Sequence, residues 1–506
     1  MILRNIKAVP NLLFISFISF VLFSSCSSSD VTVVEDRPQR GEQAEREAPP
    51  AEEDPQAVDF RDFRIGIVGK MQNLDPLFAE NIATLNAISL IYEGLFKLDE
   101  SGEPVPVLVS DFEISDDSLT YTFRIRNNVF FHDSEAFSAG IGRRLVSSDV
   151  KYAFERTAHM AVPPVASRLF MNIEGYELYY NEQRYLYDSS LRILKGVTGI
   201  HTPDNQTVVI SLREPDSDFL HKLSSPYAVI YPGEAVRSEQ VVFAKNPVGT
   251  GKYTFNRFTG EDDIVLTYNQ KHWAEDVSFR DRFNRIDIKT YETEGKLFQE
   301  FARKEVDLIS DPGIETRKQI LNSAGSLITA YQDIYKLIHN TGTRKGYLAF
   351  NPTFDGDIQP LLRAIQASEN VYEKIEIFGL QTLVSNRMPE LQNNGELPGS
   401  YLTPFTENPY IRKILLDLSR NLIEPQSNIR LMDVRIPNSF TALKFLEMDH
   451  FHYERVTDLP EKVWFEYTLD TFSLAHNYVT GIKSNGVAWW TDLSSIRLDD
   501  KQRAGL

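Results

Sequence analysis

The stretch Asn246-Pro-Val-Gly-Thr-Gly-Lys-Tyr253 constrains the fold of this chain more than any other. Proline fixes its own φ and holds the residue before it in extended geometry, and glycine accepts backbone conformations that are closed to residues with a Cβ atom. The residues that follow, 254–258, alternate in character as a half-buried strand does. The sequence therefore predicts a tight turn that leads into a strand.

The Gly-x-Gly-Lys spacing of this stretch also suggests a phosphate-binding loop. Such a loop has the form Gly-x-x-x-x-Gly-Lys-Ser/Thr and lies between a strand and a helix. Here Lys252 is followed by tyrosine, and no strand-loop-helix pattern surrounds it. A structural turn is therefore the better interpretation of Gly249 and Gly251.

Length and charge limit the class of protein. With 506 residues, of which 42% are hydrophobic and 11% aromatic, the chain has enough apolar material for two or three globular lobes. Its net charge of −18 argues against binding nucleic acid, whose phosphates require a basic surface. The same charge argues against attachment to anionic lipid through a polybasic patch. We therefore expect no nucleic-acid partner.

The N-terminal residues 1–26 have the pattern of an export signal. Arg4 and Lys7 precede an apolar stretch at 8–23, which ends in Ser-Ser-Cys26. Cys26 is the only cysteine, so it forms no internal disulfide and no Cys-pair metal site. Its position resembles that of the lipidated cysteine in lipoprotein signals, although Phe23 departs from the leucine that usually opens the motif. We predict a lipoprotein signal peptide over 1–26 with lipid attached at Cys26; a plain secretory signal is the alternative.

Residues 27–57 differ sharply in composition from the rest of the chain. They are rich in Ser, Glu, Arg, Pro and Gln and almost free of aromatic residues, which is typical of a disordered acidic tether. A flexible chain of about 30 residues spans several nanometres, at roughly 5 to 6 Å times the square root of its length. No later stretch is long and apolar enough to span a bilayer.

The rest of the chain mixes strand and helix patterns without internal repeats, which indicates the α/β class. At 120–126 the alternation is regular, with Tyr121, Phe123 and Ile125 on one face. In chain order we expect a strand at 63–68, a helix at 82–96, a strand-turn-strand unit at 94–106, a strand at 120–126 and a helix from Ser147 to about Arg156.

Several segments, taken in order, resemble the family 5 extracellular solute-binding proteins, the peptide-, nickel- and related binding components of ABC importers. The opening stretch resembles their Pro-Val-Gly-Thr-Gly-Pro-Tyr signature, with Lys252 in place of the second proline. The other segments are Leu74-Asp-Pro76, Ile91-Tyr-Glu-Gly-Leu95, 116–123, 126–133, 148–156, 208–215, 219–228, 269–273, 301–309, 347–351 and 362–365. The resemblance covers about 60–365 well and the final third poorly. It is interrupted by Ser134, where the family has glycine, and by an insertion at about 137–145.

The resemblance implies an α/β, two-lobed fold of the periplasmic-binding-protein type II, with an inserted subdomain in the first lobe and a hinge of two crossing strands. On this pattern we expect lobe 1 at 58–284 with the subdomain at about 90–195, a shortened lobe 2 at 285–467, and a return segment at 468–506. The hinge crossings are expected at 283–289 and 467–472. Two such lobes close because only a ligand that contacts both of them favours the closed state.

The resemblance also implies the function: capture of a small solute, with peptide as the first candidate, and its delivery to an ABC permease. We expect a monomer, held by its lipid on the periplasmic side or at the cell surface. Some oligopeptide-binding members contact ligand just after Leu-Asp-Pro, which here gives Glu80, Asn81 and Ile82 as ligand-binding residues. Alternatives are a related binding protein for a metal chelate, haem or saccharide, or a degenerate member that binds another protein.

One family feature has no counterpart that can be located in the sequence. The acidic residue that pairs with a peptide's ammonium group lies in a region that this chain has shortened. An enclosed ammonium group without a partner is costly, so either another carboxylate serves or the ligand lacks a free amine.

Motifs for metal binding and catalysis are weak or missing. His450-Phe-His452, with Asp449 and Glu454, places two histidines on one strand face without a third ligand, so we predict no metal and no cofactor. Gly-x-Ser-x-Gly, His-Glu-x-x-His and the Rossmann glycine pattern are absent, so we predict no catalytic residues. A hydrolase whose triad is assembled only by folding is the alternative.

Overall fold

The computed structural model describes most of the chain up to residue 350 and shorter segments after it. The described residues are 62–71, 73–79, 82–260, 262–274, 283–322, 324–350, 358–359, 361–362, 380–384, 400–404, 413–414, 416–418, 430–434, 443–449, 463–482 and 496–499. Residues 1–58 form one unit and residues 59–506 another. The predicted signal peptide, Cys26 and the tether therefore lie outside the described residues. Within the described part, no helix has the length and apolar character needed to cross a membrane.

A nine-stranded mixed sheet organises the folded unit, in the order β16-β12-β17-β11-β1-β10-β9-β8, with β13 also paired to β17. Strand β1 (Asp62–Val68) is parallel to β10 (Arg285–Tyr291) on one side and to β11 (Leu308–Ile309) on the other. The alternating residues of β1 bury Phe63 and Ile65, which confirms the strand predicted at 63–68. Next to β10 lie β9 (Asp263–Tyr268) and β8 (Tyr253–Thr259).

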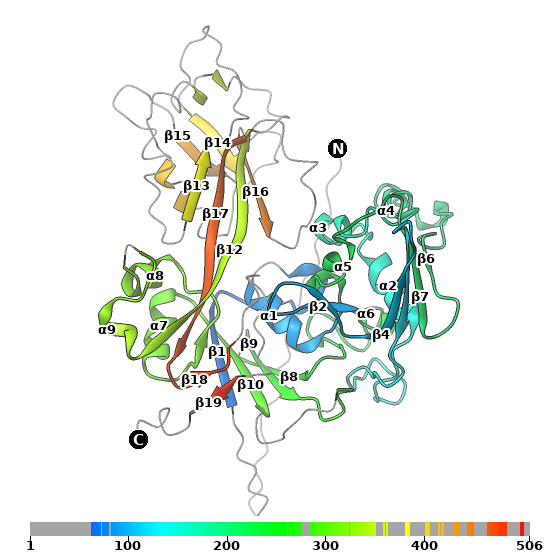
Figure 1. Cartoon of the computed structure of the whole chain (residues 1–506), viewed down its shortest axis with the longest axis horizontal. Coiled ribbons are helices and arrows are strands. Elements are labelled where there is room, and N and C mark those ends of the chain that lie inside the picture. The colour runs from blue at the N-terminus through cyan, green and yellow to red at the C-terminus, as the bar shows by residue number, and fades with distance from the viewer. Residues whose placement is uncertain are drawn as a thin grey trace, which may run out of the picture. The chain divides into compact units, whose positions relative to one another are not determined.

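Two long strands connect the halves of this sheet, β12 (Tyr335–Phe350) and β17 (Val463–His476). They pair in antiparallel register along most of their length, with an irregularity between Asn340 and Arg344 (Figure 1). At one end β17 pairs with β11, and at the other with β13 (Leu380–Val384), while β12 pairs with β16 (Leu443–Asp449). The return crossing expected at 467–472 falls within β17. The outward crossing expected at 283–289 falls instead on β10, between β1 and β9, so β12 is the strand that accompanies β17.

A separate four-stranded sheet takes two strands from the segment at about 90–195 and two from residues 200–211, just after it (Figure 1). Its order is β4 (Val109–Ile114), β5 (Thr120–Ile125), β7 (Thr207–Ser211) and β6 (Ile200–His201). The three alternating residues predicted to share a face, Tyr121, Phe123 and Ile125, are all buried. Helix α2 (Ser147–Arg156) contacts β7 and has the predicted bounds. The Asp149 carboxylate, rather than a serine, accepts the N–H of Val146 at its start.

The other elements connect and cover these two sheets. Helix α1 (Ile82–Ile91) ends five residues before the predicted end, and β2 (Phe96–Leu98) pairs with β3 (Pro104–Pro106) as the strand-turn-strand pattern predicts. The remaining described elements are η1 (Pro76–Phe78), α3 (Pro164–Arg168), α4 (Tyr176–Tyr185), η2 (Ser189–Leu191), α5 (Phe219–Lys222), η3 (Pro226–Ala228), α6 (Gly233–Val236), α7 (Glu294–Ala302), α8 (Ile314–Ile320), α9 (Thr329–Gln332), β14 (Ser400–Pro404), β15 (Arg430–Val434), β18 (Val479–Thr480) and β19 (Arg497–Leu498).

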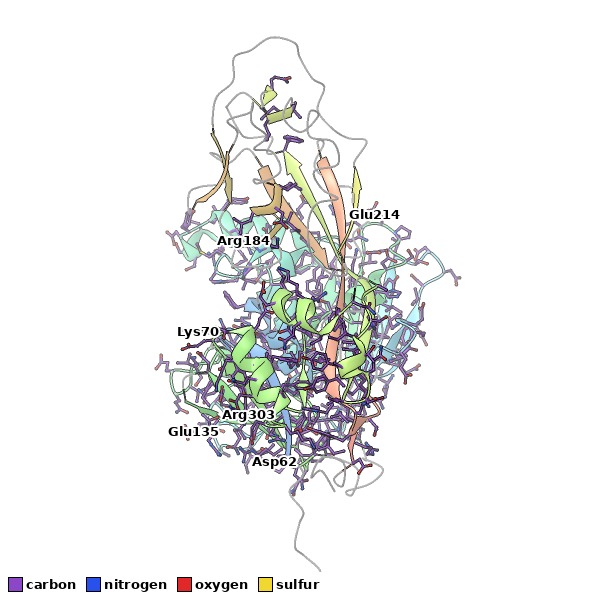
Figure 2. The ribbon with its side chains drawn as sticks, turned by 90° about the vertical axis from the view of Figure 1, so that its left-hand side faces the viewer. Asp62, Lys70, Glu135, Arg184, Glu214 and Arg303 are labelled. Carbon is purple, nitrogen blue, oxygen red and sulfur yellow. The ribbon has the colours of Figure 1, made fainter. Side chains whose placement is uncertain are left out.

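The described residues contain one large apolar core and a second core under α7. The large core joins β1 and α1 to the four-stranded sheet. In the second, Phe298 and Phe301 of α7 pack with Tyr335 of β12 and Phe472 of β17. Arg303, which is labelled in Figure 2, caps the C-terminal end of α7. The two long strands are thus fixed by apolar packing at the end where β17 meets β11.

Candidate ligand-binding region

The predicted ligand-binding residues follow the Leu-Asp-Pro segment. Glu80 and Asn81 lie outside the described residues, and Ile82 is the first residue of α1, with its side chain not described. The structure does describe residues 73–79, which lead into this segment, and the contacts that hold them. These contacts decide how firmly the backbone is fixed where a ligand is expected.

Asp75 is the central anchor of residues 73–79. Its carboxylate accepts the N–H of Leu77 at 3.2 Å and so caps η1. The guanidinium of Arg156, at the end of α2, binds both carboxylate oxygens, with one nitrogen–oxygen distance of 2.9 Å. The same guanidinium lies over the rings of Tyr231 and Phe243, at 5.2 and 5.6 Å from their centroids. Burial is the largest single influence and opposes the charge, but the hydrogen bond to Asp75 and the interactions with Asp75 and Tyr231 together outweigh it and raise the pKa of Arg156.

Two tyrosine hydroxyls hold the backbone on either side of this anchor. The hydroxyl of Tyr92 donates to the carbonyl of Leu74, and that of Tyr227 donates to the carbonyl of Ala79, each at 3.2 Å. Ala79 immediately precedes Glu80. The backbone is therefore fixed up to the residue before the predicted ligand contacts.

The Gly249 turn packs against the C-terminal end of α1. The N–H of Gly251 donates to the carbonyl of Ile91 at 2.9 Å, and the carbonyl of Gly249 accepts the N–H of His132 at 2.8 Å. A Cβ atom at Gly249 would lie 2.1 Å from the carbonyl oxygen of Ile91, so no larger residue fits this approach. Strand β8 begins at Tyr253, which confirms the predicted turn and strand.

Glu93 links this turn to a third segment of the chain. Its carboxylate accepts hydrogen bonds from the hydroxyl of Thr250 at 2.9 Å and from the indole N–H of Trp273 at 2.9 Å, and it lies 3.1 Å from Nε2 of His272. The guanidinium of Arg126 lies over the indole ring, 4.7 Å from its centroid. The network thus ties the end of α1 to the turn and to residues 269–273.

His132 is a titratable group inside this region. Its Nε2–H donates to the carbonyl of Gly251 at 2.9 Å, and Nδ1 has no hydrogen-bond partner among the described residues. Burial lowers the pKa of His132 from 6.5 to about 4. The folded protein therefore keeps a neutral imidazole in a pH range where the unfolded chain is protonated.

We expect the free energy of unfolding to fall on acidification because of His132. The contribution is fully present above about pH 6.5 and is lost as the pH falls toward 4, up to about 3 kcal/mol. His132→Gln, which keeps a side-chain donor but does not titrate, should flatten the pH dependence of urea unfolding. His201→Gln, at an exposed position, serves as the control and should leave the pH dependence as it is. Equal slopes for the wild type and His132→Gln would contradict the assignment.

The inner end of β17 is held by a buried carboxylate, Asp307. Its two oxygens accept hydrogen bonds from the Arg64 guanidinium at 3.1 and 3.2 Å, from the backbone N–H of Arg64 at 2.9 Å and from the Tyr478 hydroxyl at 2.9 Å. The imidazole of His476 stacks on the rings of Phe301 and Tyr478, 4.2 and 4.8 Å between centroids. These contacts fix the end of β12 and β17 that lies next to β11, which we call the fixed base of the strand pair.

The described residues offer no site for a metal. No group of three or more His, Cys, Asp or Glu side chains that could hold an ion occurs among them. His450 and His452 lie outside the described residues. Asp116 and Asp117 form the turn before β5, where Asp117 accepts the N–H of Leu119 at 3.1 Å.

Sequence comparison identifies one matching family model and several relatives of this chain. The family model described as bacterial extracellular solute-binding proteins, family 5 Middle, matches residues 103–366, just over half of the chain. The glutathione-binding protein GsiB of Pectobacterium atrosepticum is 27% identical over 213 residues, 42% of this chain and 35% of that protein. Di/tripeptide-binding protein 1 of Pseudomonas aeruginosa is 27% identical over 196 residues, 38% of this chain and 34% of that protein. The chain thus spans about a third of the length of these two relatives. The dipeptide-binding protein DppE of Bacillus subtilis is 21% identical over 448 residues, 82% of this chain and 76% of that protein.

Solved structures agree over most of the chain. The murein tripeptide binding protein MppA of Escherichia coli has a TM-score of 0.67 at 14% identity, covering 87% of this chain and 99% of that chain. Listeria monocytogenes OppA bound to peptide has a TM-score of 0.64 at 15% identity, covering 87% and 99%. At this identity the likeness shows the fold alone, and it confirms the predicted α/β, two-lobed, type II periplasmic-binding-protein-like class. Together with the family match over more than half of its residues, this establishes that the chain belongs to family 5 of the bacterial extracellular solute-binding proteins.

Proposed function

We propose that the protein is the extracytoplasmic substrate-binding component of an ABC importer, and that it captures a short peptide or a peptide-like solute for a permease. The observation that carries this proposal is the family match at 103–366, with relatives named for binding glutathione, dipeptides and tripeptides. The family consists of binding proteins rather than enzymes, and we propose that this member carries out no chemistry on its ligand.

We propose that Glu80, Asn81 and Ile82 contact the ligand. Their support is the firmness of the preceding backbone, which the Asp75–Arg156 ion pair and the Tyr227 hydroxyl hold up to Ala79. A backbone that is fixed before binding loses less conformational entropy when the ligand arrives. A micromolar dissociation constant needs about 8 kcal/mol, which several buried hydrogen bonds and apolar contacts supply.

We propose that closure uses β12 and β17 as the hinge. Their base is fixed by Asp307 and by the apolar core under α7, while the register irregularity between Asn340 and Arg344 interrupts the pairing farther along. In this arrangement lobe 2 consists of the residues that follow β12 and precede β17 in the sequence. Its proposed start therefore moves from residue 285 to the end of β12. Lobe 1 then holds the rest of the described chain, including the subdomain at about 90–195.

We also propose the predicted attachment and location. The signal peptide ends before Cys26, the lipid is attached to that cysteine, and residues 27–57 are the tether that holds a monomeric body on the outer side of a membrane. Its partners are then the solute, the permease and the lipid bilayer. The support is the sequence pattern of residues 1–57 together with the extracytoplasmic family.

Small molecules released on denaturing the purified mature protein identify the ligand class. A ladder of short peptides in mass spectrometry is the expected result. A purified protein that releases nothing, and whose melting temperature is unchanged by peptide, metal-chelate, haem and saccharide panels, would contradict solute capture. That outcome favours the degenerate, protein-binding alternative.

The positioning of residues 80–82 has its own test. Tyr227→Phe removes the hydroxyl that binds Ala79, so we expect peptide affinity to fall about 3- to 10-fold in isothermal titration, equivalent to one hydrogen bond. The matched control is Tyr121→Phe, which removes a tyrosine hydroxyl bound to the carbonyl of Asp216 at 3.3 Å in the four-stranded sheet. The control should leave affinity unchanged. If Tyr227→Phe and Tyr121→Phe bound peptide with the same affinity, Tyr227 would have no role in positioning the ligand site. The proposal that the protein captures peptide would still stand.

A further inference from the structure

Exposed apolar side chains lie along α4 and on the loop after it. We call them the tyrosine-rich patch; its residues are Leu178, Tyr185, Tyr187, Leu191 and Ile193, with exposed fractions of 68%, 71%, 80%, 61% and 80%. Leu178 and Tyr185 are seven residues apart in α4 and so share one helix face, beside Arg184, which Figure 2 labels. A soluble surface seldom gathers this much large apolar area without a partner.

The loop that displays the patch is held firmly by its own polar groups. The Glu182 carboxylate accepts the N–H of Ile193 at 2.7 Å and that of Leu194 at 3.1 Å. Arg192 donates to the side chain of Gln183 at 2.9 Å and to the carbonyl of Leu186 at 3.0 Å. These hydrogen bonds hold the loop in the conformation that exposes Leu191 and Ile193, although Asp188, Ser190 and Lys195 are exposed beside them.

The charge around the patch differs from that of the whole chain. Residues 176–197 contain three acidic residues and three basic ones, Arg184, Arg192 and Lys195, so their net charge is zero. The whole chain, in contrast, has a net charge of −18. Electrostatic repulsion between this segment and anionic lipid headgroups is therefore smaller than the net charge of the whole chain would give. Tyrosine with leucine and isoleucine, flanked by cations, is the composition that the membrane–water interface accepts.

The predicted tether limits how far the folded unit can lie from the membrane. Asp62, the first described residue, comes 36 positions after Cys26. A flexible segment of that length spans about 30 to 36 Å. Tethering at such distances gives effective concentrations in the millimolar range, so a contact too weak to bind a free protein is sufficient.

We propose that the tyrosine-rich patch docks on the lipid surface of the membrane, as a second contact beside the lipidated cysteine. This inference rests on the proposed anchor at Cys26. A protein attached at two points has fewer orientations open to it than one attached only by its tether.

The test uses the lipidated protein on vesicles of phosphatidylethanolamine and phosphatidylglycerol. Lipidation blocks Cys26, the only cysteine, so an introduced cysteine carries the only reactive thiol. Tyr187→Cys reports on the patch, and Val242→Cys, 65% exposed and outside the patch, is the control. Each is labelled with a nitroxide, and collision rates with oxygen and with a water-soluble nickel chelate are measured by electron paramagnetic resonance.

On vesicles we expect the label at 187 to gain collisions with oxygen and to lose collisions with the nickel chelate, while the label at 242 is unchanged. Adding Leu191→Glu and Ile193→Glu should abolish this difference without releasing the protein from floating vesicles. If the protein floats with the vesicles but the labels at 187 and 242 show the same collision rates, the patch does not dock on lipid. The proposed lipid anchor at Cys26 would then still stand. Protein that does not float overturns the anchor and this inference together. Shielding that appears only when the vesicles contain a permease would assign the patch to a protein partner instead of lipid.

Discussion

Asp307→Ala is expected to lower the free energy of unfolding by about 3 kcal/mol, because it removes the buried carboxylate of the ion pair and leaves the Arg64 guanidinium only the Lys304 carbonyl and the exposed Glu305. The Asp307 side chain is fully buried and accepts four hydrogen bonds, three of them from Arg64, whose own side chain is 18% exposed. Removing the carboxylate also strands the backbone N–H of Arg64 in β1 and the hydroxyl of Tyr478. Urea unfolding followed by circular dichroism measures the loss.

The matched control is Glu305→Ala, because Glu305 contacts the same guanidinium. Its carboxylate lies 3.4 Å from Nη1 of Arg64, but its side chain is 55% exposed. Exposed ion pairs contribute little, so we expect a loss below about 1 kcal/mol. If the two variants lost the same stability, burial would not be the cause, and the fixed base of the hinge would lose its main support.

Gly249→Val is expected to cost at least about 3 kcal/mol of stability, since the new side chain meets backbone that has little room to move. Its Cβ would lie 2.1 Å from the carbonyl oxygen of Ile91 and 2.9 Å from the ring of Tyr92. Ile91 ends α1, and Tyr92 is fully buried and bound to Leu74. Thermal unfolding should show a large decrease in melting temperature, or no folded protein at all.

Gly295→Ala provides the opposite case. Gly295 lies in the first turn of α7, and an added Cβ would meet nothing within 4 Å. Alanine there should be neutral or stabilise the protein by up to about 1 kcal/mol. Ligand affinity distinguishes scaffold from site: a Gly249→Val protein that folds normally but no longer binds would show that the turn belongs to the binding site.

Elements that bury one regular face could be predicted from sequence alone. Strand β5 and helix α2 have their predicted positions, because the alternation at Tyr121, Phe123 and Ile125 and the acidic start at Asp149 are local patterns. Helix α1 was predicted too long for the same reason. Tyr92 and Leu95 continue its apolar spacing and are indeed buried, but Gly94 forms a bridge to Val229 and ends the helical geometry.

The long-range contacts that fix the Gly249 turn and the end of β17 left no comparable signal. Glu93 and Thr250 are 157 residues apart, Arg64 and Asp307 are 243 apart, and no spacing rule connects such pairs. The resemblance to the family gave Glu80, Asn81 and Ile82, which stay predictions. The outward crossing predicted at 283–289 lies on β10, and the proposal that β12 is the hinge strand rests on its long-range pairing with β17, which no local pattern marks.

The position of β17 in the large sheet has a consequence for biosynthesis. This strand is made after both of its neighbours in the sheet, because it lies between β12 and β11 and pairs Leu308 of β11 with Ala475. Contacts between residues so distant in sequence form slowly, because the chain must first close a long loop. The sheet therefore cannot be completed until the chain has left the ribosome as far as His476, the last residue of β17. A chain that stays incompletely folded for that long gives the export machinery time to thread it across the membrane before the body closes.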